Sequence, residues 1–242
     1  MRLREIYLIE TTEEDRAIVS LASALSNLLT TKYDNHIGPV GTIGELVDTP
    51  LTICNSITIE LDNEQGIQQR MKDSFPDDVT KLGTDVEGIW YADDKTIVID
   101  EEYLGSSYLQ SVLAHELRHA LDDFKSDFKA NVSSSYSTPK KKEFRNVTND
   151  PYVGNMAYIA EPAEINARFL QVLDQLTTTI RQSVKLYPND PKPAIMKEFK
   201  NILAHYHISD LFPEKELSKD YKRLMKRAID YIEKELAHLQ NK

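Results

Sequence analysis

Two histidines and a glutamate lie in one short segment, His115-Glu116-Leu117-Arg118-His119, which has the pattern H-E-x-x-H. On a helix, residues four apart lie on one face, so both imidazoles can reach a single metal ion about 2.0–2.1 Å away. Glu116 lies about 100° round the helix from His115, so its carboxylate can reach a water at the metal without replacing an imidazole. The spacing therefore predicts a zinc site with Glu116 as general base.

A catalytic zinc site needs a third protein ligand and one open position. Pro162 favours the first position of a helix, which places Glu164 in its first turn. We predict Glu164 as the third ligand, although a glutamate there also caps its own helix or pairs with Arg168 in many proteins. Three other side chains remain open as the third ligand: Glu161, His205 and His207.

Further side chains are candidates for supporting roles at this site. Asp122 and Asp123 follow the motif too far along the helix to ligate the same ion, since eight residues climb about 12 Å. They are predicted instead to accept the distal N–H of His119 and fix its tautomer, with a solvated acidic pair as the alternative. Tyr158 and Arg168 are candidate donors to an oxyanion, with packing or ion pairing as the alternative.

The motif must lie on a helix for this chemistry, and the sequence predicts one from Ser106 or Ser107 to Phe124. Its apolar positions share one side, opposite the histidines: Leu109, Leu113, Leu117, Ala120 and Phe124. The other predicted elements are a helix over 13–33, turns over 36–44, a strand over 51–61, a hairpin over 89–99, and helices over 162–186, 194–206 and 214–239. The order is a mixed front half and a helical back half.

Residues 125–155 separate the two predicted ligand-bearing helices and break every periodicity. Six basic side chains concentrate there: Lys125, Lys129, Lys140, Lys141, Lys142 and Arg145. Two interpretations stay open, a lid that attracts an acidic substrate or partner and a solvated loop.

Composition excludes several classes of protein. The 242 residues carry 39 acidic and 29 basic side chains, a formal charge of −10, which disfavours non-specific nucleic-acid binding. The single cysteine, Cys54, excludes an internal disulfide framework and is predicted to be a small buried side chain. The first residues have too short an apolar run for a signal peptide, and no segment is apolar enough to span a bilayer. We expect a cytoplasmic protein with no membrane partner, and association with a virion stays open.

His115-Glu-Leu-Arg-His119 followed by Glu164-Ile-Asn-Ala-Arg168 resembles the zincin metallopeptidases, in the gluzincin-like arrangement, and distantly the ImmA/IrrE-type peptidases. The resemblance implies an α+β fold with a small mixed sheet, an active-site helix and a helical C-terminal part. It implies a zincin-like domain over 1–186, with its core at about 85–180, and a helical subdomain over 187–242. The predicted hairpin resembles the zincin sheet whose edge strand lines the substrate cleft.

The expected function is zinc-dependent hydrolysis of a peptide bond in a peptide or protein substrate, with Glu116 taking a proton from the attacking water. The alternative, from another class, is a structural or binding protein, for instance a phage assembly component, that retains the zinc site without turnover. Analogy with the family alone adds peptidase-like regulation of a transcription factor. The C-terminal helices are a candidate surface for a protein partner.

Overall fold

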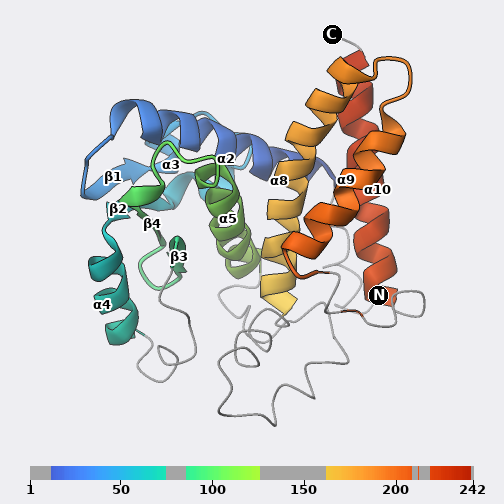
Figure 1. The fold of residues 1–242 in the computed structure, drawn as a ribbon. Helices are drawn as coiled ribbons and strands as arrows, with labels where there is room; N and C mark the ends of the chain where they lie inside the picture. The colour runs from blue at the N-terminus through green and yellow to red at the C-terminus, as the bar shows by residue number, and fades with distance from the viewer. Residues whose placement is uncertain (1–11, 75–85, 126–161, 209–211, 213–218, 241–242) are drawn as a thin grey trace.

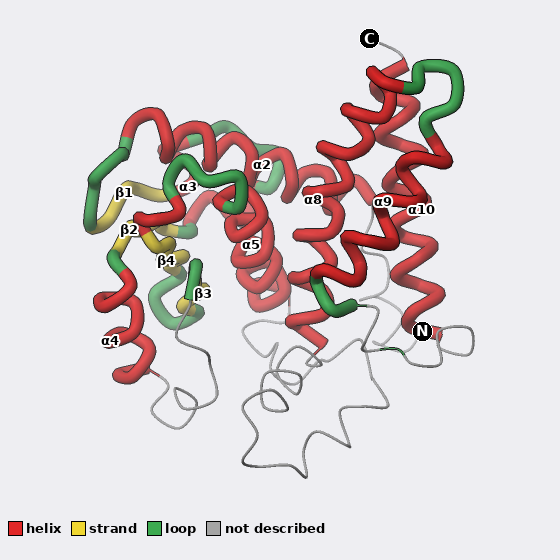
Figure 2. Tube along the Cα trace, in the orientation of Figure 1, coloured by secondary structure: helices red, strands yellow, loops and turns green. Residues whose placement is uncertain are grey.

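A small sheet at one end of the molecule and a set of packed helices make up an α+β fold (Figures 1 and 2). The computed structural model describes residues 12–74, 86–125, 162–208, 212 and 219–240. The strands are β1 Gly38–Thr42, β2 Thr58–Asp62, β3 Gly88–Tyr91 and β4 Thr96–Asp100. The helices are α2 Thr12–Lys32, α3 Ile43–Leu46, α4 Glu64–Ser74, α5 Leu109–Lys125, α8 Pro162–Leu186, α9 Lys192–His205 and α10 Lys219–Gln240. The short 3-10 turns are Thr52–Ser56 and Glu101–Tyr103.

The sheet is mixed and has the order β1-β2-β4-β3, with β2 parallel to β4 and the other pairs antiparallel. The inner strand β4 is buried at every position, as the apolar run Ile97–Ile99 requires when both faces are covered. Ile97 and Ile99 belong to the main core, which α5 also enters. Val98 points the other way and packs with Ile67 and Met71 of α4. Strand β3 is last in the strand order, so it is an edge strand, and it lies next to α5.

Helix α5 lies in the middle of the molecule, packed against α8, α2 and β3 (Figure 1). Ser106 caps it, because its Oγ accepts hydrogen bonds from the backbone N–H of Leu109 at 3.2 Å and of Tyr108 at 3.3 Å. The predicted apolar face is confirmed: Leu109, Leu113, Leu117 and Ala120 are fully buried and Phe124 is partly buried. The helix also buries Val112, Ala114 and Arg118, because α2 and α8 cover sides that the sequence pattern left to solvent.

Four helical predictions are confirmed to within three residues at each end, as α2, α5, α8 and α9, and the fifth, over 214–239, is described as α10 Lys219–Gln240. The predicted hairpin is confirmed as β3 and β4, while the first half of the sheet was predicted only in part. Residues 36–44, predicted as turns, form β1 and α3, and the bulge between Pro39 and Gly41 explains why turn residues stand in a strand. Gly38 and Gly41 have φ of 113° and 146°, conformations that favour glycine. The predicted strand over 51–61 is a 3-10 turn followed by β2, and α4 was not predicted at all.

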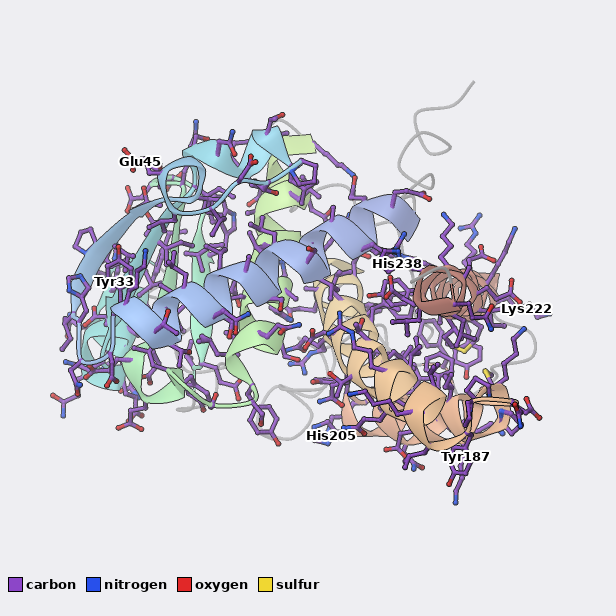
Figure 3. All side chains as sticks on the ribbon, turned by 90° about the horizontal axis from the view of Figure 1, so that it is seen from above. Tyr33, Glu45, Tyr187, His205, Lys222 and His238 are labelled. Atoms are coloured by element: carbon purple, nitrogen blue, oxygen red, sulfur yellow. The ribbon has the colours of Figure 1, made fainter. Side chains whose placement is uncertain are left out.

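The helices α8, α9 and α10 pack together at the end of the molecule opposite the sheet, and α2 runs across from the sheet to reach them (Figures 1 and 3). Helix α10 contacts both α8 and α2. The predicted division of the chain at residue 187 stays a prediction. None of the described helices has both the length and the apolar character needed to cross a membrane. Cys54 is buried, as predicted, and burial raises the pKa of its thiol to about 12.

Candidate metal centre

The ligand-type side chains of α5 and α8 meet where the two helices pack together. His115 and His119 project from α5 one turn apart, and Glu164 projects from the first turn of α8. Their ligand atoms all lie within 4.8 Å of one another, and they form the group of metal-ligating type found among the described residues. Pro162 begins α8, as predicted, so Glu164 occupies a first-turn position, and its Oε1 lies 3.0 Å from Nε2 of His119 on α5.

The distances between these atoms define a compact triangle. Nε2 of His119 lies 3.0 Å from Nε2 of His115 and 3.0 Å from Oε1 of Glu164. Nε2 of His115 lies 3.5 Å from Oε2 of Glu164. In a tetrahedral zinc site with bonds of about 2.0–2.1 Å, two ligand atoms lie about 3.3–3.4 Å apart. The three donors therefore fit the size of a zinc site.

Burial of this triangle adds a second argument for an ion. Glu164 is 4% exposed, and the Oε2 atom of its carboxylate has no hydrogen-bond partner among the described residues. The nitrogens nearest to that oxygen are Nε2 of His115 at 3.5 Å and Nε of Arg168 at 3.8 Å, and a metal ion would give it a direct ligand contact. Two imidazoles and a carboxylate are also the donor set of many catalytic zinc sites. The residues present thus fit zinc in number, type and spacing.

The three side chains are electrostatically coupled. Burial alone would raise the pKa of Glu164, but His119 and His115 hold it well below its usual value. Burial alone would lower the pKa of His119, but the charge and hydrogen bond of Glu164, with Glu116 and Asp122, raise it to about 9. His119 in the metal-free protein therefore holds a proton at neutral pH, where zinc would require the neutral imidazole.

Glu116 lies beside the triangle without belonging to it. Its Oε1 is 4.0 Å from Nε2 of His115, and the residue is 6% exposed. Burial raises the pKa of its carboxyl group, although the two histidines and a hydrogen bond from the backbone N–H of Trp90 oppose that shift. A buried carboxylate with a raised pKa next to the ligands is suited to accept a proton.

The edge strand β3 holds Glu116 from the side of the sheet. Trp90 donates its backbone N–H to Glu116 and its indole Nε1–H to Oδ2 of Asp123, at 2.7 Å. The approach of β3 to α5 requires glycine at position 88, since a Cβ there would lie 2.7 Å from Cγ1 of Val112. The sheet therefore positions the candidate base, while α8 positions the third candidate ligand.

The two aspartates predicted to support His119 have other hydrogen-bond partners. Asp122 accepts hydrogen bonds from Arg118 and from Nδ2 of Asn166, the latter at 2.9 Å. Asp123 accepts from the indole of Trp90, and burial raises the pKa of its carboxyl group. Neither is the solvated acid of the alternative interpretation, since each binds a partly or fully buried side chain. The role of either one toward the tautomer of His119 stays a prediction.

Of the remaining candidates, Arg168 lies beside the triangle, with its Nε 3.8 Å from Oε2 of Glu164. That nitrogen has no hydrogen-bond partner among the described residues, and the oxyanion role of Arg168 stays a prediction. His205, at the end of α9 (Figure 3), and His207, two residues beyond it, are exposed and do not belong to the triangle. Three predictions lie outside the described residues: Glu161, Tyr158, and the lid over 125–155 beyond Lys125.

Two residues near the centre escaped the sequence analysis. Glu87, just before β3, has its pKa raised by burial, and His115, Arg168 and Glu116 all act on its charge. Trp90 holds Glu116, as described above. The sequence signal for Glu87 and Trp90 was their position at the predicted hairpin, shortly before the motif helix. One sequence alone does not show that these residues contact the motif, because they lie more than twenty residues from it along the chain.

Comparison with family models, with curated proteins and with solved structures finds no match to this chain. The resemblance to zincins therefore stays an expectation drawn from the residues of the motif.

Proposed function

We propose that this protein is a zinc-dependent metallopeptidase of the zincin class, in which His115, His119 and Glu164 hold the metal and Glu116 is the general base. The observation that carries the proposal is the triangle of three donor atoms, supplied by two helices and separated from one another by 3.0–3.5 Å. The carboxylate of Glu116 lies 4.0 Å from His115. The small mixed sheet with its edge strand against the motif helix supports the zincin assignment. The substrate is a peptide or protein.

Zinc would supply Lewis-acid chemistry here, activating water near neutral pH and polarising a carbonyl group. The carboxylate of Glu116 takes a proton from the attacking water and returns it to the leaving amine. Its raised pKa favours the first transfer, because burial makes this carboxylate a stronger base than an exposed glutamate. The hydrogen bond from Trp90 fixes the carboxylate in place. Arg168 would donate to the oxyanion from one turn after Glu164, on the same face of α8.

Replacing the base separates hydrolysis from metal binding. We expect Glu116→Gln to lower the rate of hydrolysis of a fluorogenic peptide mixture by about 10²–10⁴-fold while bound zinc stays near one equivalent. Glutamine retains the acceptor for the N–H of Trp90, so the fold is preserved. Glu198→Gln, an exposed glutamate on α9, is the matched control and should keep wild-type activity.

The other outcomes decide between the two classes of function. Hydrolysis that survives in Glu116→Gln with zinc bound would contradict the proposed role of the base. A wild-type protein that binds zinc and cleaves nothing would support the alternative of a binding or assembly protein with a retained site. A protein that takes up no zinc would contradict both.

A further inference from the structure

A chain of buried polar side chains runs from α2 and α10 to the helices that carry the candidate ligands. Arg227 of α10 forms a two-pronged ion pair with Asp15 of α2, through Nε at 2.6 Å and through Nη2. Its remaining nitrogen, Nη1, donates to Oδ1 of Asn166 on α8 at 2.8 Å. Asn166 in turn donates from Nδ2 to Oδ2 of Asp122 on α5 at 2.9 Å. Four helices are thus joined through one asparagine.

This junction lies within about one turn of two of the candidate ligands, Glu164 and His119. Asn166 follows Glu164 by two residues on α8, and Asp122 follows His119 by three residues on α5. The hydrogen bond between Asn166 and Asp122 therefore crosses the same gap between the helices as the contact between Glu164 and His119. A change in the separation of α5 and α8 at this point would move the ligand atoms apart.

Burial and charge fix the junction in one orientation. Asp15 is fully buried, Asn166 is 4% exposed, and the Arg227 side chain is 9% exposed. The amide oxygen of Asn166 faces the guanidinium of Arg227 and the amide nitrogen faces the carboxylate of Asp122. A flipped amide would place its N–H donors against the guanidinium donors and its oxygen against the carboxylate oxygens. Asp122 is held from the opposite side by the fully buried Arg118, which also donates to Glu14 at 2.8 Å. Negative and positive side chains therefore alternate along this hydrogen-bonded series.

We propose that Asn166, oriented by Arg227, is a positioning residue for the metal centre, setting the distance between the two ligand-bearing helices through its hydrogen bond to Asp122. The inference rests on the proposed metal site. It gives α10 a part in the site even though this helix supplies none of the candidate ligands. The C-terminal helix then acts on metal binding through a hydrogen-bonded chain rather than by contact with the metal.

Reversing the polarity of one hydrogen bond tests this role. In Asn166→Asp the new carboxylate still accepts the hydrogen bond from Arg227. It cannot donate to Asp122, so two carboxylates face each other where the amide N–H made a hydrogen bond. We expect zinc affinity, measured by competition with a chromophoric chelator, to fall about 10–100-fold, and the visible absorption bands of the cobalt-loaded protein to change. In the double variant Asn166→Asp with Asp122→Asn, the new amide of residue 122 donates to the new carboxylate. Its net charge equals that of the wild type, and zinc affinity should recover to within about threefold.

A matched control separates positioning from general loss of stability. Thr177 on α8 is hydrogen-bonded to Tyr231 on α10 at 2.6 Å. This buried pair joins α8 to α10, as Arg227 and Asn166 do, but lies farther from the candidate ligands. Thr177→Val should lower the melting temperature of the metal-free protein and leave zinc affinity and the cobalt spectrum unchanged. The proposal is overturned if Asn166→Asp binds zinc as the wild type does, or if the double variant folds without recovering affinity. A wild-type protein that binds no zinc would contradict the proposed function and this inference with it.

Discussion

The helices α5 and α8 enclose two buried carboxylates whose surroundings shift their pKa values in opposite directions. Asp174 accepts hydrogen bonds from Oγ of Ser111, at 2.9 Å, and from Gln110, both neutral donors, and burial raises its pKa. Glu164 is more deeply buried, yet two imidazoles hold its pKa well below the usual value. Burial alone therefore does not decide the charge of a carboxylate between these helices.

The two clusters also differ in what they leave unsatisfied. The neutral donors satisfy Asp174 and tie α5 to α8, which is all that a structural cluster needs. At Glu164, one carboxylate oxygen lacks a hydrogen-bond partner among the described residues, and so does Nδ1 of His115. A cluster that is costly as it stands and matches the donor set of zinc is the better candidate for function.

The largest expected effect is a loss of zinc affinity when the carboxylate of the Glu164 cluster is removed, but not when that of the Asp174 cluster is removed. Zinc binding of about 10–16 kcal/mol, shared by three ligands, gives each about 4 kcal/mol, or about 10³-fold in affinity. We expect Glu164→Ala to lose about that factor in chelator competition. Asp174→Ala removes the carboxylate of the other cluster and should keep wild-type affinity at a cost in stability. Equal losses in both variants would contradict the distinction between the clusters.

The pH dependence of zinc affinity gives the second largest effect. Because the pKa of His119 is about 9 in the metal-free protein, zinc must displace its proton below that pH. Apparent affinity should rise nearly tenfold per pH unit well below pH 9, in all about 50-fold from pH 7 to 9, and then level off. The raised pKa also stabilises the metal-free fold below about pH 6.5, and that stabilisation is lost as the pH rises through about 9.

Chelator competition between pH 6.5 and 9.5, corrected for protonation of the chelator and hydrolysis of zinc, measures this dependence. The Asp174→Ala variant should follow the same curve, because its cluster contains no imidazole. An affinity that stays constant from pH 7 to 9 would show that His119 holds no such proton.

The smallest effect concerns stability at the structural cluster. Ser111→Ala removes the hydroxyl that donates to Asp174 and leaves a buried carboxylate with one partner fewer. We expect the free energy of unfolding, measured in urea, to fall by about 1–3 kcal/mol. Zinc affinity should remain that of the wild type, although Ser111 lies one helical turn from His115. A loss of zinc affinity here would merge the two clusters into one functional unit.

The parts of the site that one sequence could predict are those fixed by local geometry. His115 and His119 are four residues apart on a helix, and Pro162 fixes the start of α8 and with it the position of Glu164. Both depend on helical periodicity and on first-turn preferences, which act within a few residues. The placement of Glu164 against α5 needed the further assumption that the two helices pack together.

What the sequence could not predict depends on contacts between distant segments. Arg227 and Asp15 meet through the packing of α10 on α2, and nothing in either segment marks its partner. β1 was missed because Gly38 and Gly41 favour turns until a neighbouring strand pairs with them. Trp90 is an ordinary strand residue until α5 brings Glu116 to its backbone N–H.

The candidate ligands come from two helices that lie far apart in the sequence, so no local stretch of chain contains the complete set. Under the proposed function, the native protein binds zinc far better than its unfolded chain does, and the concentration of free zinc becomes a determinant of stability. At free zinc about 100 times the dissociation constant, the native state gains about 2.7 kcal/mol. A cell that withholds zinc would then lower the native population and the activity of this protein by the same equilibrium.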